Sequence, residues 1–160
     1  MAIERSFNLI KPLGVERNLV GYIIKKFSMK GLQLTGLKMV QPTREIVAQN
    51  YIDNKDEPFY NDLVDYVSSG PVVCMIWTGE NAVESARQVV GDKNPLKSDV
   101  GSIRGSVDNS AVKNVIHGAR TPEEAEREIL LWFGSVGPPP LYEAMPAAVA
   151  EAFPQSIKPS

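Results

Sequence analysis

The sequence has few of the residues from which disulfide frameworks and metal centres are usually built. Its 160 residues include one cysteine and one histidine. One cysteine excludes an internal disulfide framework and a cysteine-rich zinc site, and one histidine excludes a metal site with several histidine ligands. The cysteine, Cys74, lies inside an apolar run, so we expect a small buried hydrophobic side chain rather than a nucleophile.

Neither sign of charge is in large excess, and long apolar runs are absent. Lys and Arg number 17 against 19 Asp and Glu, a formal net charge of −2 that gives no indication of nucleic-acid binding. The longest apolar run, 71–77, is too short to cross a bilayer. Glu4, Arg5 and Lys11 interrupt the N-terminal segment, which excludes a secretory signal. We therefore expect a cytoplasmic protein without a membrane partner.

The hydrophobic pattern predicts an α+β domain. Alternating or continuous apolar residues predict strands over 5–10, 32–40, 71–77 and 114–118. Apolar residues at helical spacing predict helices over 19–30, 43–51, 56–67, 80–90 and 121–133. This order suits a ferredoxin-like sandwich, in which helices cover a mostly antiparallel four-stranded sheet.

Local signals set the expected boundaries of these elements. Residues 11–14, Lys-Pro-Leu-Gly, predict a turn after the first strand, and Gly36 a bulge in the second. Asp56 is the expected cap of the third helix, whose apolar face would include Phe59. The last helix has a predicted capping box: Thr121 as cap, Pro122 at the first helical position and Glu124 three residues after the cap.

Two segments carry no clear periodicity. Residues 91–113 are rich in Gly, Ser, Asp and Asn, and a loop of this length in a compact domain is usually functional or disordered. Residues 134–160 begin with GSVGPPPL, which excludes helix and inner strand at that point. We expect one domain over 1–133 and a Pro/Ala-rich tail that could pack on a neighbouring subunit.

The candidate for catalytic chemistry is His117, the only histidine. It ends an expected strand and precedes Gly118 and a helix start, a place where a side chain can face a cleft. Glu128 lies at the edge of the apolar stripe of the last helix, next to Ile129. It could bind one imidazole nitrogen, fix the tautomer and leave the other nitrogen as a nucleophile. Spacing alone favours the alternative, in which Glu128 is an ordinary solvated carboxylate.

Three cations are candidates for binding phosphate. Lys11 ends a strand, Arg87 lies on a helix before the long loop, and Arg104 lies between glycines inside that loop. Together they could clamp a polyphosphate and stabilise charge on a transferring phosphoryl group, although scattered surface cations are common. The sequence has no Walker A or GxGxxG motif, so such a site would not be a glycine-rich phosphate loop. Tyr51 and Phe59 could stack on a base, but aromatic residues are more often part of the core.

Taken together, these segments resemble the nucleoside diphosphate kinase family. The most specific match is NVIHG (114–118) followed by a helix with a glutamate before ILLWF. The resemblance covers residues 3–133 almost without a gap, and its other main stretches are FNLIKPLGVERNLVG, GLQLTGLKMV, the run from Tyr51 to Arg87 and VVGDKNPLKSDVGSIRG.

The resemblance implies a ping-pong transfer between nucleoside tri- and diphosphates through a phosphohistidine at His117, oriented by Glu128. Because stacking on Phe59 reads no base edge, broad base tolerance follows. Magnesium would arrive with the nucleotide and not occupy an all-protein metal site. Family members are usually hexamers and sometimes tetramers, so we expect a homo-oligomer, with the hexamer favoured. The positions that match nucleotide-binding residues of the family are Lys11, Tyr51, Phe59, Leu63, Arg87, Lys93, Arg104 and Asn114.

This chain departs from the family pattern near the expected site. Lysine replaces a threonine or serine at Lys93, alanine replaces a serine at Ala119, and arginine replaces an acidic residue at Arg120. Further departures are Leu13, Ser106 and Val107. The histidine, its carboxylate and the three cations are all present, so we expect an active enzyme. The departures leave a second hypothesis, a binding or scaffold protein on the same fold with little or no catalysis.

Overall fold

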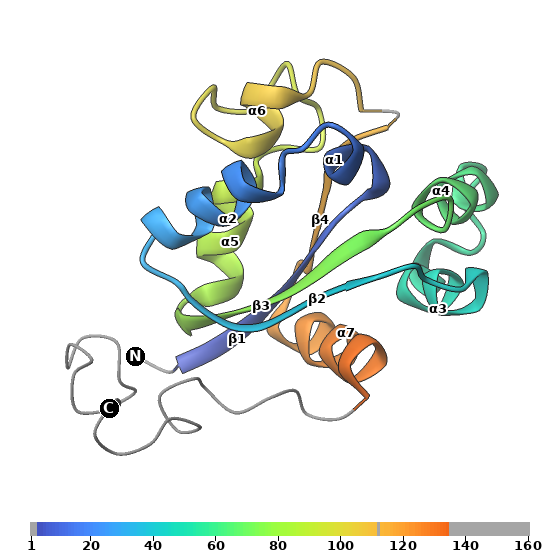
Figure 1. The fold of residues 1–160 in the computed structure, drawn as a ribbon, viewed down its shortest axis with the longest axis horizontal. Helices are drawn as coiled ribbons and strands as arrows, with labels where there is room; N and C mark the ends of the chain where they lie inside the picture. Colours follow the sequence, from blue (N-terminus) through green and yellow to red (C-terminus); the bar gives the residue numbers. More distant parts are fainter. Residues whose placement is uncertain (1–2, 112, 135–160) are drawn as a thin grey trace.

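The computed structural model describes residues 3–111 and 113–134 as one sheet flanked by helices (Figure 1). The strands are β1 (Ile3–Ile10), β2 (Gln33–Val40), β3 (Val72–Glu80) and β4 (Ile116–Gly118). The helices are α1 (Pro12–Glu16), α2 (Val20–Met29), α3 (Arg44–Asn50), α4 (Tyr60–Val67), α5 (Ala82–Val90), α6 (Ile103–Val107) and α7 (Pro122–Phe133), with a 3₁₀ turn, η1, at Ile52–Asn54.

The four strands form one antiparallel sheet in the order β2-β3-β1-β4. This confirms the predicted α+β class and the expected positions of the strands. The register of β2 against β3 shifts between Leu34 and Gly36, which confirms the predicted bulge. A side chain at Gly36 would not fit, because a Cβ atom there would lie 2.6 Å from the Cδ1 atom of Ile76.

Helices cover both faces of the sheet, so β3 is buried on both sides. Successive side chains of a strand point to opposite faces. Met75 and Trp77 pack in the core beneath α2 and α5, whereas Cys74 and Ile76 pack in the core beneath α3, α4 and α7. Figure 1 shows these two groups of helices on opposite sides of the sheet. The fully apolar sequence of this strand is thereby explained, and the expectation of a buried Cys74 is confirmed.

The predicted end signals of three helices are confirmed. The Thr43 hydroxyl accepts a hydrogen bond from the backbone N–H of Ile46, at 3.2 Å, at the start of α3. The Thr121 hydroxyl accepts one from the backbone N–H of Glu124, at 3.1 Å, at the start of α7. Gly31 follows α2 with a φ of 92°, a backbone conformation that favours glycine.

Three local predictions are wrong. Residues 11–14 do not form a simple turn but lead into α1, because Pro12 stands at the first helical position, where its fixed φ suits a helix. Asp56 does not cap α4, which begins at Tyr60 with Phe59 as its N-cap residue. Phe59 is also 49% exposed, so it does not share the buried face with Val64 and Val67.

The long loop contains one helix that periodicity did not predict. α6 is only five residues long, and its N-cap is Ser102, whose hydroxyl accepts a hydrogen bond from the backbone N–H of Gly105 at 3.1 Å. Of the tail expected over 134–160, the described residues include only Gly134, which ends α7 with a φ of 75°. Over the described ranges, we find no helix that is long and apolar enough to span a membrane.

Candidate active site

The centre of the candidate site is His117 on the edge strand β4. Its backbone is held in register by pairing with Leu9 of β1, and its carbonyl accepts a hydrogen bond from the Nδ2 atom of Asn8 at 3.4 Å. The side chain is 11% exposed, and its imidazole lies edge-on to the ring of Tyr51, with 5.2 Å between the ring centroids. Strand pairing and packing therefore fix both the backbone and the ring of this histidine.

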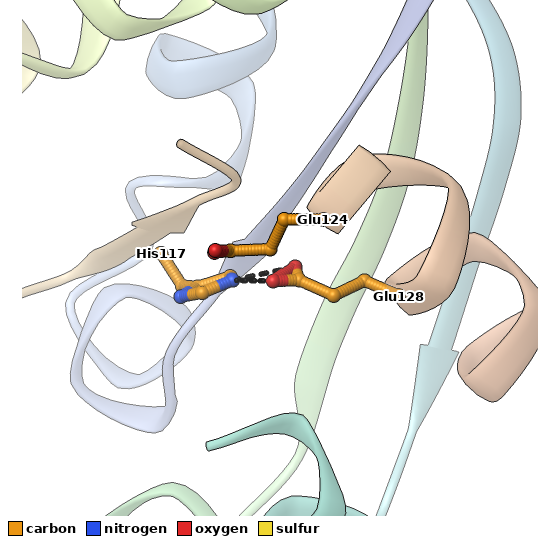
Figure 2. A group of neighbouring side chains, drawn as sticks. All are labelled: His117, Glu124 and Glu128. Atoms are coloured by element: carbon orange, nitrogen blue, oxygen red, sulfur yellow. Dashed lines mark hydrogen bonds and ion pairs between the residues drawn. The ribbon is translucent and has the colours of Figure 1, made fainter. Parts of the chain in front are cut away.

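Glu128 reaches His117 from α7. The Nε2 atom of His117 lies 2.9 and 2.8 Å from the two carboxylate oxygens of Glu128 (Figure 2). Glu128 is 1% exposed because it shares a face of α7 with the buried residues Ala125 and Trp132. The expected contact is thus confirmed, and the alternative of a solvated carboxylate is wrong. The catalytic role of the pair stays a prediction.

The hydrogen bond to Glu128 determines which ring nitrogen of His117 can act as a nucleophile. A carboxylate accepts a hydrogen bond, so the neutral imidazole carries its proton on Nε2. The Nδ1 atom then has a free lone pair, and Figure 2 shows it directed away from Glu128. Burial raises the pKa of the Glu128 carboxyl above its ordinary value, and the charge and hydrogen bond of His117 act in the opposite direction.

Lys11 brings a buried amine to the site. It is 5% exposed at the end of β1, its backbone N–H donates to the carbonyl of Val115 at 2.8 Å, and its Nζ atom lies 6.0 Å from the centre of the Tyr51 ring. Burial lowers the pKa of Lys11 from 10.5 to about 7, with a further contribution from the positive charge of Arg104. The amine is therefore poised to gain a proton when an anion binds beside it.

Arg104 of α6 contacts the backbone on both sides of the site. Its guanidinium donates to the carbonyl of Ile116 at 3.0 Å and to that of Gly91 at 3.3 Å. These bonds tie the long loop to β4 and to the end of α5. Figure 1 shows α1 and α6 at the same end of the sheet, beside the start of β4. Burial lowers the pKa of Arg104, though its ordinary value is so high that the group stays charged.

Several buried polar atoms around the histidine have no hydrogen-bond partner among the described residues. They include the Tyr51 hydroxyl, the Nε atom of Arg104 and the Oδ1 atom of Asn114. Buried polar atoms are normally satisfied, by protein, water or ligand. The site therefore offers donors and acceptors to a polar ligand, as well as positive charge from Lys11 and Arg104.

Four further predicted binding residues come from α5, the loop after it and the start of α4. Arg87 lies on the exposed face of α5 and lines a cleft of about 640 Å³ together with Gly91, Asp92 and Arg120. Lys93 is exposed immediately after Asp92. Exposed Phe59 is the N-cap residue of α4, and Leu63 packs partly buried against the core one turn later. The structure thus brings Tyr51, Lys11, Arg104 and Glu128 around His117, and leaves Phe59 and Lys93 at the periphery.

Sequence reasoning did not assign three residues to the site, namely Arg120, Glu124 and Asn8. Arg120 donates two hydrogen bonds to one carboxylate oxygen of Glu124, and it also lies 3.9 Å from Asp53. Asn8 contacts the backbone of His117 from the neighbouring strand. Glu124 and Arg120 were identified only as a cap residue and a departure. Their place next to the motif could have indicated them, whereas the cross-strand position of Asn8 required the register.

Comparison with known proteins identifies the family. The family model for nucleoside diphosphate kinase matches residues 4–136. The chain belongs to the nucleoside diphosphate kinase family. It is 50% identical over 133 residues to a nucleoside diphosphate kinase of Synechococcus sp. (strain CC9311), which covers 83% of this chain and 88% of the relative. It is 49% identical over 130 residues to nucleoside diphosphate kinase A of Rattus norvegicus, covering 81% and 86%.

Solved nucleoside diphosphate kinase structures have the same fold. The crystal structure of the Encephalitozoon cuniculi nucleoside diphosphate kinase superposes with a TM-score of 0.82 at 41% identity, and covers 85% of this chain and 92% of that one. A Babesia bovis family member superposes with a TM-score of 0.79 at 45% identity, covering 81% and 88%. Family and fold confirm the predictions of a ferredoxin-like sandwich and of a nucleoside diphosphate kinase, whose substrates are nucleotides.

Proposed function

We propose that this nucleoside diphosphate kinase works by a ping-pong mechanism through a phosphohistidine at His117. The observation that supports it is the buried bond from Nε2 to Glu128, which leaves the Nδ1 lone pair for attack. Nδ1 forms a bond to the γ-phosphorus of a nucleoside triphosphate as the bond to the β,γ-bridging oxygen breaks. The diphosphate leaves with that electron pair. A second diphosphate then attacks the phosphorus and releases the imidazole.

The proposed intermediate places a positive charge on the imidazole ring, because Nδ1 gives up its lone pair while Nε2 keeps its proton. The ionised Glu128 carboxylate, 2.8 Å from Nε2, would stabilise that charge. Lys11 and Arg104 would stabilise the negative charge of the phosphoryl oxygens, and Arg87 that of the outer phosphates. Tyr51 and Asn114 are proposed to bind the nucleotide through their unpartnered polar atoms.

Magnesium is proposed to enter with the nucleotide. Carboxylates near the histidine are already occupied, since Glu128 accepts from His117 and Glu124 from Arg120. The other charged groups facing the ring, Lys11 and Arg104, are cations. This set of side chains suits phosphate oxygens, on which Mg²⁺ is carried, better than it suits a bare ion. When bound, the ion would supply positive charge to the phosphates.

The proposed mechanism is tested by intact-mass spectrometry of the full chain at neutral pH. Incubation with a nucleoside triphosphate and Mg²⁺ is expected to add one phosphoryl group, and addition of a different nucleoside diphosphate is expected to remove it. Incubation with a nucleoside diphosphate alone is the control, because it has no γ-phosphate to give. A folded chain that gains no mass would disprove the phosphohistidine and support the binding or scaffold role instead.

Broad base tolerance is proposed to follow from stacking on Phe59, with Leu63 beside it. Phe59 is 49% exposed at the start of α4, where its ring is open to a ligand. Phe59→Ala is expected to raise the KM for every nucleoside triphosphate roughly 10-fold, with little change in kcat, because stacking contributes about 1–3 kcal/mol per base. Steady-state kinetics with four different bases measures this.

Phe59→Trp is the matched control for this stacking prediction, because it keeps an aromatic surface and is expected to keep a KM near that of the parent chain. A loss in Phe59→Ala that differs strongly between bases would contradict the proposal, since it would mean that the base edge is recognised at this position.

We also propose that copies of the chain assemble through the edge of β2, which is the outer strand of the sheet formed by the described residues. Leu37 and Met39 are 51% and 60% exposed on the same face of this strand. Unpaired edges with exposed apolar side chains are typical of surfaces that another chain covers. The favoured hexamer, the division into a domain over 1–133 and a tail, the tail's contact with a neighbour, and the cytoplasmic location stay predictions.

A further inference from the structure

A second carboxylate lies beside the His117–Glu128 pair. Glu124 is one helical turn before Glu128 on α7, so the two side chains project from the same face. The ligand atoms of His117, Glu124 and Glu128 all lie within 4.8 Å of one another. The Glu124 side chain is only 13% exposed. Figure 2 shows its carboxyl group lying alongside the imidazole and the Glu128 carboxylate.

Arg120 holds this second carboxylate. Its Nε and one terminal nitrogen lie 3.1 and 3.0 Å from the same oxygen of Glu124. The bond to Glu124 raises the pKa of Arg120, and Asp53 lies 3.9 Å from the same guanidinium. Two carboxylates one turn apart repel each other, and an arginine paired with the outer one offsets that repulsion.

The side chains that act on the pKa of Glu128 are His117 and Glu124. Ala119, which packs with Ala125 of α7, is buried and has no side-chain polar atom. Burial is the largest influence on the pKa of Glu128, His117 lowers that pKa, and the charge of Glu124 raises it. Glu124 therefore acts directly on the carboxylate that orients the histidine.

We propose that Glu124, held by Arg120, is a positioning residue that sets the proton affinity of His117 by placing a second negative charge beside the imidazole ring. The proposal rests on the proposed function of His117 as the phosphoryl acceptor. A negative charge beside the ring favours every positively charged form of it, both the protonated imidazole and the phosphorylated one. Glu124 would thus stabilise the phosphohistidine, and Arg120 would limit the effect.

Other charged or titratable groups of the site stay constant in the test. Nearest the ring are Lys11, Tyr51 and Arg104. Asp53 lies 3.9 Å from Arg120, and Asp108 acts on the pKa of Lys11 and of Arg104. Because none of them is altered, a change in the His117 signals after substitution of Glu124 or Arg120 reports on those two residues alone.

The experiment uses the fact that the chain has one histidine. With ¹⁵N-labelled histidine, the imidazole signals of the full chain belong to His117, and a pH titration follows its protonation and tautomer without nucleotide. Glu124→Gln is expected to move the midpoint of His117 protonation about one pH unit lower, because a negative charge near the ring is lost. Arg120→Ala is expected to move it the other way, by about half a unit.

The matched control is Glu123→Gln, which removes the same charge from an exposed residue of the same helix and is expected to leave the titration unchanged. Glu124→Asp keeps the negative charge, so the midpoint of His117 protonation in this variant is expected to lie close to that of the parent chain. A Glu124→Gln titration that superimposes on that of the parent chain would overturn the proposal. Arg120 is exposed, so its variant keeps the test available if Glu124→Gln does not fold.

The titration and the mass measurement test two separate claims, and either claim can be disproved without the other. A parent chain that gains no phosphoryl mass, but whose histidine titration responds to substitution of Glu124 and Arg120 as expected, would disprove the proposed function and leave the positioning role of Glu124 intact. A chain that is phosphorylated normally, but whose titration ignores Glu124, would disprove only the positioning role.

Discussion

Replacing His117 with alanine is expected to abolish phosphorylation of the chain and to lower phosphate transfer by more than about 10⁴-fold. The chain has no second histidine that could take over. The backbone of β4, Lys11 and Arg104 are all left in place, so the nucleotide can bind but its γ-phosphorus meets no imidazole nitrogen. Intact-mass spectrometry and coupled transfer kinetics measure the two losses.

The control for this prediction separates chemistry from folding. Removing the imidazole leaves the buried Glu128 carboxylate without its donor, which costs about 1–3 kcal/mol of unfolding free energy. His117→Gln keeps a donor for Glu128 and is expected to be more stable than His117→Ala, yet equally inactive. Both variants are expected to bind a nucleoside diphosphate with an affinity close to that of the parent chain.

One outcome would contradict the assignment of the nucleophile. The pKa of Lys11 is lowered to about 7, so its amine is partly uncharged at neutral pH and is itself a potential nucleophile. Substantial transfer in the folded alanine variant, with a phosphoryl group mapped to Lys11 by peptide sequencing, would move the reaction to that amine.

Replacing Lys11 with methionine is expected to weaken catalysis and to stabilise the fold. The amine is proposed to stabilise charge on the transferring phosphoryl group, and loss of one such contact typically lowers kcat about 10²–10³-fold. Methionine has a similar shape and no charge, so the cost of burying the amine disappears. At pH 7 the free energy of unfolding is expected to rise by about 1–4 kcal/mol.

The pH dependence of stability gives the sign of this effect. In the folded chain the pKa of Lys11 is about 7, below its ordinary value of 10.5. Between these two pH values the unfolded chain binds more protons than the folded chain, so the free energy of unfolding rises with pH. Below pH 7 the cost of burying the charged amine lowers the free energy of unfolding by its full amount. Lys11→Met is expected to lack this slope, so its advantage over the parent chain shrinks toward pH 10.

Denaturant titrations from pH 6 to 10 and calorimetry of nucleotide binding measure these effects. Near pH 8 the parent chain is expected to take up a proton when a nucleoside diphosphate binds, because the phosphates favour the charged amine, and the methionine variant is not. Lys25→Met, on the exposed surface of α2, is the matched control for loss of charge. A Lys11→Met chain with unchanged kcat would contradict the role proposed for Lys11.

The sheet and the helices could largely be predicted because their signals are local. The continuous apolar run of β3 and the helical spacing in α2, α5 and α7 follow from burial on a fixed side of each element. The errors arise where local signals compete. Asp56 is a good cap by type, yet α4 begins at Tyr60. Ser102 caps a five-residue helix that is too short to show a periodicity.

The candidate site was predictable only in part, because its geometry depends on contacts between distant segments. The resemblance placed His117 and Glu128 together, whereas spacing alone favoured a solvated Glu128. No pattern shows that Lys11 is buried beside Tyr51, or that Arg104 binds the carbonyls of Gly91 and Ile116. Those facts follow from how β1, α6 and β4 meet, which the sequence specifies only through the complete fold.

The burial of Cys74 makes this kinase suitable for selective labelling. Its thiol lies in the central strand β3, and burial raises its pKa to about 12, so it reacts slowly with maleimides or iodoacetamides. Because no other cysteine is present, a cysteine introduced at an exposed position next to Phe59 would be the one accessible thiol. A fluorophore attached there would report nucleotide arrival in real time, with the natural cysteine left in place.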